Sequence, residues 1–168
     1  MVKMMKMREQ MMRRKERAVT ELKEITEIIA KCEVMRLALT DGNKPYIVPL
    51  NYGYILKDDT LSIYFHSAKE GKKVEMLRNQ PECCFEMDCS FEVKRDEVSC
   101  RWTAHYESVV GEGEASIVET TEEKKEAMNA IMHHYGYEGI PEYQEKVLEH
   151  TLLFQIKVHE ICGKRNLD

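Results

Sequence analysis

Short runs in which apolar and polar residues alternate recur along the chain, and turn residues separate them. The clearest run is 60–66, where Leu61, Ile63 and Phe65 occupy every second position. A period of two is typical of a β-strand with one buried face. Few helices interrupt these runs, and strands do not alternate regularly with helices. The pattern therefore predicts an antiparallel α+β fold and disfavours a doubly wound parallel sheet.

Further strands are expected on both sides of this run. Residues 34–40 and 46–54 are rich in Val, Ile, Leu and Tyr and flank the turn at Asp41-Gly42-Asn43, which predicts a hairpin. Other strands are expected at 83–88, at 106–110 with a continuation at 114–118, and at 151–161. The polar stretch 90–104 fits either a loop or a weak pair of strands.

Three helices are expected from apolar spacing and capping signals. Between residues 20 and 32 apolar side chains recur at helical spacing. A capping box at 67–70 predicts that a short helix begins directly after a strand ending at His66. A second capping box at 120–123 opens a helix that ends at Gly136. The side chains expected to face inward from this helix are Ala127, Met128, Ile131, Met132 and Tyr135.

Length and charge limit the classes of protein that need to be considered. The 168 residues predict a single domain spanning 1–168, with a basic, Met-rich arm at 1–17. The formal net charge of -5 disfavours a general nucleic-acid or anionic-membrane partner. No apolar run approaches the roughly 18 residues of a membrane-spanning helix, and the arm lacks the apolar core of a signal peptide. We expect a cytoplasmic protein with no nucleic-acid partner and no membrane partner.

Six cysteines and six histidines offer no metal-binding pattern. The cysteines form no C-x-x-C pair, and the histidines lack the helical i,i+4 spacing of paired metal ligands. An even cysteine count is compatible with disulfides, but free and mostly buried thiols are the expectation for a chain of this size. No metal is expected.

Residues 65–73 are the segment richest in candidate chemistry. A helix that starts directly after a strand presents unpaired N–H groups and a positive dipole end, which suit a phosphate. Ser67 adds a hydroxyl, Gly71 permits close approach, and Lys72 or Lys73 adds a charge-assisted contact. The alternative is a capped surface helix with two solvated lysines, where Glu70 repels a phosphate. His66 likewise fits either a binding site or the rim of the core.

Four segments in the same order resemble the nitroimidazole-resistance proteins and their relatives in the pyridoxamine 5'-phosphate oxidase-like flavoprotein superfamily. They are Arg13-Arg14-Lys15-x-Arg17, Pro45-Tyr-Ile-Val-Pro-Leu-Asn-Tyr52, Ile63-Tyr-Phe-His-Ser-Ala-x-x-Gly-x-Lys73 and Tyr106-x-Ser-Val-x-Gly-x-Gly113. The third segment is the most specific. The resemblance covers nearly the whole chain, and only 90–104 and the residues after Gly136 match poorly.

This resemblance implies a split β-barrel of about six antiparallel strands with flanking helices, and FMN held between the two subunits of a homodimer. By position, Val48, Pro49, Leu50 and Asn51 would lie beside the isoalloxazine ring, while His66, Ser67, Lys72 and Lys73 would hold the phosphate. Tyr106 and Ser108 would approach the flavin from another strand, and His66 is the candidate catalytic residue. Trp102 and Tyr106 fit either a cover for the flavin or aromatic packing in the core.

Two functions of different classes follow from the resemblance. The first is an FMN-dependent oxidoreductase that takes electrons from a donor such as NAD(P)H and reduces a small acceptor, for instance an aromatic nitro compound. The second is a carrier or redox sensor that binds the flavin without turnover. Oxidation of pyridoxamine phosphate is disfavoured, because the serine-arginine-lysine phosphate signature of those oxidases reads Gly71-Lys72-Lys73 here. A related flavin, a deazaflavin or haem remains an alternative to FMN.

Overall fold

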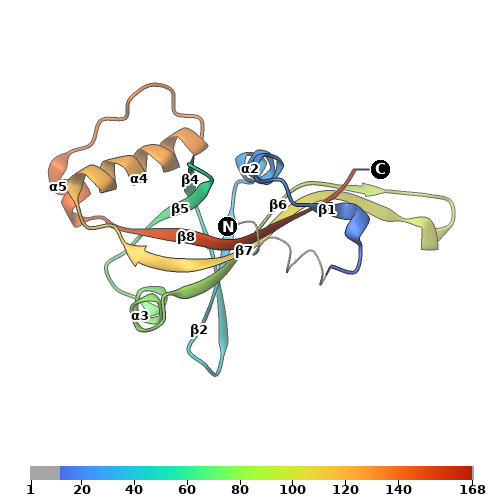
Figure 1. Ribbon diagram of the computed structural model, residues 1–168, viewed down its shortest axis with the longest axis horizontal. Coiled ribbons are helices and arrows are strands. Elements are labelled where there is room, and N and C mark those ends of the chain that lie inside the picture. Colours follow the sequence, from blue (N-terminus) through green and yellow to red (C-terminus); the bar gives the residue numbers. More distant parts are fainter. Residues whose placement is uncertain (1–11, 168) are drawn as a thin grey trace.

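The computed structural model describes residues 12–167 and contains eight strands and four α-helices within them (Figure 1). The strands are β1 (Ala18–Val19), β2 (Met35–Thr40), β3 (Pro45–Leu50), β4 (Gly53–Lys57), β5 (Thr60–Ser67), β6 (Glu82–Lys94), β7 (Thr103–Ile117) and β8 (Leu152–Asn166). The α-helices are α2 (Leu22–Lys31), α3 (Lys72–Asn79), α4 (Thr121–His134) and α5 (Glu145–His150). Two short 3-10 turns are η1 (Lys15–Arg17) and η2 (Ser99–Arg101).

All eight strands belong to one antiparallel sheet in the order β3-β2-β6-β7-β8-β5-β4, with β1 paired to the end of β8. β3 and β4 lie at opposite ends of this order, although only residues 51 and 52 separate them along the chain. The sheet therefore curls until its two edges meet at this corner, where no pairing joins these two described strands. The result is an open, or split, antiparallel barrel with flanking helices, which confirms the predicted fold class.

Two apolar clusters pack on the sheet. The larger lies between the strands and α2, whose Ile25, Ile28 and Ile29 are fully buried. The smaller lies under α4 and includes Ala127 and Ile131. In Figure 1, α2 and α4 lie above the sheet and α3 lies below it. Although α2 and α3 lie on different sides in this view, both contribute side chains to the larger cluster, whereas α4 covers the smaller cluster on the opposite face of the curved sheet.

Predictions that depended on local pattern are confirmed. The periodic stretch after residue 20 forms α2, and the runs on either side of the turn at Gly42 form the β2–β3 hairpin. The second capping box is present at α4: Thr120 Oγ1 accepts from the Glu123 N–H, and the Glu123 carboxylate accepts from the Thr120 N–H. The helix ends at His134, two residues before Gly136, which has a positive φ.

The predicted number and bounds of the strands need correction. The described residues form eight strands, not about six, because the run 46–54 divides into β3 and β4 and because β1 had not been expected. The division occurs at Tyr52, whose side chain is drawn into the core and turns the backbone away from β2. The last strand extends to Asn166, and helix α5 was also not expected.

The capping box predicted at 67–70 is wrong. Ser67 is the last residue of β5, and four residues follow before α3 begins at Lys72. Gly71 is the N-cap, with φ of 123° and ψ of 165°, and no side chain caps the helix. This backbone conformation is essentially confined to glycine, so Gly71 determines where the helix starts.

The stretch 90–104 is a strand pair, which confirms one of its two predicted alternatives. It extends β6 and β7 past the body as a long two-stranded ribbon, with a register shift between Cys89 and Glu92 and the turn η2 at its end (Figure 1). In α4, Tyr135 was predicted to face inward but is 43% exposed. Tyr135 follows the last residue of the helix, and its hydroxyl donates to the Glu33 carbonyl oxygen.

Two further sequence expectations concern the N-terminal arm and the cysteines. Residues 1–11 of the predicted basic arm lie outside the described residues, and residues 15–17 of it form η1. None of the six cysteines forms a disulfide; Cys32, Cys83 and Cys162 are buried and Cys100 is exposed. No helix in the described part of the chain is long and apolar enough to cross a membrane.

Candidate functional site

The segment predicted to lie beside a flavin ring forms the end of an edge strand. β3 is the last strand of the sheet order, so the backbone N–H and C=O groups on its outer side have no partner strand among the described residues. Val48 and Leu50 turn inward and pack against the core, whereas Pro49 and Asn51 are exposed. The strand therefore offers a row of backbone groups and small exposed side chains at the split of the barrel.

Tyr52 holds the end of this strand in place. Its buried hydroxyl lies 2.7 Å from the Ile29 carbonyl oxygen and 2.9 Å from the Cys32 carbonyl oxygen, both at the end of α2. Burial raises the pKa of the Tyr52 hydroxyl, so it stays protonated and remains a donor. The Tyr52 N–H donates to the Tyr135 hydroxyl over 3.3 Å. Tyr52, which follows Asn51 after the end of β3, is thereby anchored to the ends of α2 and α4.

His134 completes this anchor from α4. Its Nε2 lies 2.9 Å from the Cys32 carbonyl oxygen, and its ring centroid lies 4.4 Å from that of Tyr52. Because a carbonyl oxygen only accepts, Nε2 carries the proton in this contact. Burial lowers the pKa of His134 and outweighs the opposing effect of that hydrogen bond, so the neutral ring is favoured.

The two lysines predicted to bind phosphate lie over aromatic rings. Lys72 Nζ is 4.7 Å from the centroid of Tyr46, a residue of β3, and Lys73 Nζ is 5.5 Å from the centroid of Phe65, a residue of β5. Both rings orient an ammonium group without neutralising it. Burial lowers the pKa of Lys73. The start of α3, β3 and the end of β5 thus form one cationic cluster, which we call the lysine cluster: Tyr46, Phe65, Ser67, Gly71, Lys72 and Lys73.

His66 and Ser67 point to opposite faces of β5. Ser67 follows the alternation of Phe65 and lies on the side of Lys73, while His66 follows Tyr64 toward the side covered by α4. His66 is exposed and Ser67 is half-buried. Only Ser67 shares a face with the lysine cluster.

The structure does not bring Tyr106 and Ser108 to the lysine cluster of the same chain. Tyr106 pairs with Asn166 and Ser108 with Lys164, whereas His66 pairs with Leu153. At about 3.3 Å per residue, the thirteen positions from Leu153 to Asn166 correspond to roughly 43 Å along β8. The ammonium group of Lys164 lies over the Tyr106 ring, with Nζ 5.7 Å from the ring centroid.

Two hollows lie near these residues. One of about 330 Å³ lies between the β2–β3 turn and α3, where Lys72 shares the wall with the carboxylates of Asp41 and Glu75. A larger one of about 850 Å³ lies between α4, α2 and β4, and none of the predicted flavin residues lines it. Its wall combines Tyr54 and Ile55 with the carboxylates of Glu122, Glu123 and Glu126. A negatively charged wall is unsuited to a phosphate.

Tyr46 and Phe65 were not predicted as site residues. Alternation along 60–66 assigned Phe65 to the buried face of its strand, and Tyr46 was predicted only as the first residue of the strand 46–54. Their contact with the lysines depends on where α3 begins, and the capping signal misplaced that start.

Comparisons with known proteins agree with this architecture. The sequence model of the family described as pyridoxamine 5'-phosphate oxidase matches residues 21–165. A candidate 5-nitroimidazole antibiotic resistance protein from Bacteroides thetaiotaomicron is 27% identical, with a TM-score of 0.76 over 88% of this chain and 85% of that chain. No curated protein matches the chain.

Two solved structures at lower identity share the fold. The FAD and heme binding protein from Mycobacterium smegmatis has a TM-score of 0.78 at 13% identity, over 90% of this chain and 74% of that chain. A flavocytochrome from Azotobacter vinelandii has a TM-score of 0.76 at 15% identity, over 94% of this chain and 72% of that chain. The resemblance found in the four sequence segments is confirmed: the chain belongs to the pyridoxamine 5'-phosphate oxidase family of split barrels.

Proposed function

We propose that the chain binds FMN at the lysine cluster and is an FMN-dependent oxidoreductase that reduces a small aromatic nitro compound. The observation that carries the proposal is the pair of ammonium groups at the uncapped start of α3, next to an edge strand in a member of this family. The similar protein from Bacteroides thetaiotaomicron is described as a 5-nitroimidazole antibiotic resistance protein, which supports an aromatic nitro compound as the electron acceptor.

The lysine cluster fits a phosphate dianion. The N–H groups in the first turn of α3 have no side-chain cap, and the positive end of the helix dipole lies at the same place. Lys72 and Lys73 supply two positive charges, and Ser67 supplies a hydroxyl on the same face. Each charge-assisted hydrogen bond is worth about 1.5–3 kcal/mol. These groups suit the phosphate of FMN.

The end of β3 fits the polar edge of an isoalloxazine ring. Its outer backbone groups pair with no other strand in the described part of the chain, and Tyr52 fixes their position from the core. When bound, the flavin would supply the redox chemistry, and the chain would orient it and limit water access. His66 lies next to Ser67 at the end of β5, although on the other face of that strand, and we assign it to the acceptor as the group that supplies a proton. NAD(P)H is the proposed electron donor, and the protein is expected to work as a cytoplasmic homodimer.

The identity of the cofactor is the first property to test. Freshly purified protein should show flavin absorption bands, and the released cofactor should co-elute with FMN on chromatography. Release of FAD, which the neighbour from Mycobacterium smegmatis binds by its description, would correct the cofactor but keep the flavin site. A colourless protein that also fails to bind added FMN would overturn the proposal.

The phosphate contact is tested with lysine variants. The double variant Lys72→Ala/Lys73→Ala should weaken FMN binding by at least a hundredfold, since each lost contact corresponds to roughly tenfold or more. Lys57→Ala, at the exposed end of β4, is the matched control and should bind as the wild type does. Unchanged affinity in the double variant would show that the phosphate lies elsewhere.

Turnover distinguishes an enzyme from a carrier. FMN-loaded protein under anaerobic conditions should oxidise NAD(P)H when a nitroimidazole is added, and His66→Ala should slow this reaction without releasing FMN. Flavin that is bound but never reoxidised by any nitroaromatic compound would rule out the nitroreductase function.

A further inference from the structure

Two cysteines from distant parts of the sequence lie together where α2 ends. Cys32 is the C-cap of α2, and Cys89 lies on β6, more than fifty residues later. Cys32 is a buried member of the larger apolar cluster and is 1% exposed, whereas Cys89 is half-buried and packs against the margin of that cluster. Neither side chain has a part in the proposed flavin site.

The backbone brings these two residues close to each other. In the pairing of β2 with β6, Leu37 lies opposite Phe85, and continuing this register places Glu33 opposite Cys89. Cys32 precedes Glu33 and has an extended backbone, with φ of -79° and ψ of 134°. Opposing Cα atoms are about 4.5–5.5 Å apart, so a residue one position further along corresponds to roughly 6 Å. Disulfides span about 4.4–6.8 Å between Cα atoms.

The side chains complete this approach. The Cys32 thiol forms a hydrogen bond with the Cys89 thiol, so the two sulfur atoms are neighbours. Burial and the neighbouring sulfur raise the pKa of Cys32, and the carboxylates of Asp88 and Glu86 act in the same direction. Cys32 therefore keeps its proton. On the other side, the Ser90 hydroxyl donates to Cys89 Sγ over 3.6 Å.

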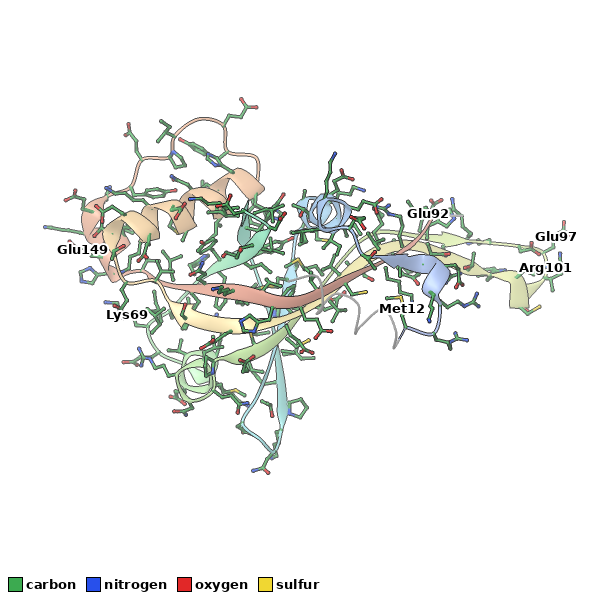
Figure 2. The ribbon with its side chains drawn as sticks, in the orientation of Figure 1. Met12, Lys69, Glu92, Glu97, Arg101 and Glu149 are labelled. Carbon is green, nitrogen blue, oxygen red and sulfur yellow. The ribbon has the colours of Figure 1, made fainter. Side chains whose placement is uncertain are left out.

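Cys89 is the member of the pair that solvent reaches. It is half-buried, and the register of β6 with β7 shifts directly after it, between Cys89 and Glu92. Figure 2 shows Glu92 where the ribbon of β6 and β7 leaves the body, and Glu97 and Arg101 at its far end. Ser90, inside this irregular segment, has a φ of 59°, outside the strand region. A disrupted ladder leaves the backbone room for the small shift that brings two neighbouring sulfur atoms to bonding distance.

We propose that Cys32 and Cys89 are an oxidant-sensitive pair that forms a reversible disulfide on reaction with a hydroperoxide. The Cys89 sulfur attacks one oxygen of the hydroperoxide, the O–O bond breaks, and the thiol proton goes to the departing oxygen. The products are a sulfenic acid at Cys89 and an alcohol, or water when the oxidant is hydrogen peroxide.

The second step consumes the buried thiol. The Cys32 sulfur attacks the sulfenic sulfur, the S–S bond forms, and the S–O bond breaks. The hydroxyl group leaves as water with the Cys32 proton. Two thiols have then lost two electrons, and the hydroperoxide has gained them. A small dithiol reverses the bond by exchange and becomes a disulfide itself.

The other four cysteines are internal comparisons for this pair. Cys83 and Cys84 are consecutive on β6, so their side chains point to opposite faces of the sheet. The Cys83 thiol donates to a backbone carbonyl oxygen over 3.3 Å, and the Cys162 thiol does the same over 3.4 Å. Cys100 lies in η2 at the far end of the ribbon and is exposed.

A disulfide at this position acts on the corner at which the sheet divides. The Cys32 carbonyl oxygen accepts from the Tyr52 hydroxyl and from His134 Nε2, each over 2.9 Å. Bonding Cys32 to β6 therefore attaches the end of α2, and this corner with it, to the middle of the sheet. The bond also closes a long loop and restricts the unfolded chain, so oxidation should raise stability.

Oxidation of the full chain with hydrogen peroxide tests the pair. Reduced protein is treated with a small excess of peroxide, the remaining thiols are alkylated, and the products are identified by mass spectrometry. The free thiols should fall from six to four, with a mass loss of about 2 Da before alkylation. Trypsin should release the segments 32–36 and 79–94 joined by a bond that dithiothreitol reduces. Fragmentation should assign this bond to Cys89 rather than to Cys83 or Cys84.

Single variants separate the roles of the two thiols. Cys32→Ser should stop at the sulfenic acid of Cys89, which dimedone traps, and should form no internal disulfide. Cys89→Ser should lose both reactions. Cys84→Ser, which is also half-buried on β6, is the matched control and should form the disulfide at the wild-type rate. Circular dichroism of the reduced variants checks that each is folded.

Stability provides a measurement that needs no variant. Oxidised wild type should unfold at a higher urea concentration than reduced wild type, and dithiothreitol should restore the lower midpoint. Three results would overturn the proposal: no bond between the segments 32–36 and 79–94, a bond through Cys100 that joins two chains in its place, or a lower urea midpoint after oxidation. None of these results depends on FMN, so the proposed function is tested separately.

Discussion

Tyr52 connects three separate parts of the chain through one hydroxyl and one N–H group. Removing the hydroxyl in Tyr52→Phe deprives the Ile29 and Cys32 carbonyl oxygens of one donor each, although the Cys32 N–H still donates to the first and His134 Nε2 to the second. We expect a loss of about 1–3 kcal/mol in the free energy of unfolding, measured by urea denaturation. Tyr54→Phe is the control, because the Tyr54 hydroxyl forms no hydrogen bond among the described residues. An unchanged stability in Tyr52→Phe would show that the anchor is unimportant.

His134 should make stability depend on pH. Its pKa in the folded chain is below the ordinary value, so the unfolded chain binds the proton first as pH falls. The contribution is fully present above the ordinary histidine pKa of about 6.5, and it is lost as pH falls from there to the folded-state pKa. Denaturation at pH 7.5 and 5.5 should therefore show a smaller difference in His134→Gln than in wild type. The exposed His159→Gln should retain the wild-type difference.

Gly71 determines the start of α3 and therefore the position of both lysines. An added Cβ meets no atom within 4 Å, so Gly71→Ala costs only the strain of its backbone conformation, about 1–3 kcal/mol. Relaxing that strain shifts the start of the helix, and FMN affinity should fall along with stability. Gly139→Ala, also at positive φ in open space, should lose stability but bind FMN normally. Equal FMN titrations for the two variants would contradict the role of Gly71.

Elements whose signals are local were predicted well, and elements that depend on distant contacts were not. Helix α2 and the cap at Thr120 follow from the residues of those segments alone. The division of 46–54 depends on a hydrogen bond from Tyr52 to α2, more than twenty residues away. The start of α3 depends on a glycine conformation that outweighed a well-formed capping pattern at 67–70. Extended ribbons such as 90–105 are polar on one side, so their sequence resembles a loop.

The same distinction applies to the candidate site. Lys72, Lys73 and Ser67 were predicted from one continuous segment, and the structure keeps them together. Tyr46 reaches that segment only through the position of α3. Tyr106 and Ser108 were assigned by resemblance, and the single chain keeps them far from the lysines.

A buried carboxylate joins α2 to the two longest strands. Glu107 is 2% exposed, and its oxygens accept from Lys31 at 2.8 Å, Arg165 at 2.7 Å and Ser90 at 3.0 Å. Burial alone would raise the pKa of Glu107, but these hydrogen bonds outweigh it and the pKa lies below the ordinary value. The network lies at the base of the ribbon, so it also fixes the direction in which the ribbon leaves the body.

Glu107→Gln should lower the free energy of unfolding at pH 7 by about 1–3 kcal/mol, because an amide replaces a charged acceptor of three donors. The wild-type advantage is present above the ordinary glutamate pKa of about 4.3 and is lost as pH falls through the folded-state pKa. Urea denaturation at pH 7 and pH 3 measures both effects. The exposed Glu114→Gln should have no comparable effect. A difference between wild type and Glu107→Gln that persists at pH 3 would exclude the charge as its cause.

The place of β8 between β7 and β5 has a consequence for biosynthesis. Residues 152–166 pair with both of these strands and with β1, so among the described strands only β8 joins the two halves of the sheet. A ribosome must therefore complete about 150 residues before the β4–β5 hairpin finds its neighbour. Until then the nascent chain exposes two unpaired strand edges, which are sites of aggregation. Early folding is restricted to local hairpins, and the yield of native protein should depend on how quickly residues 152–166 emerge.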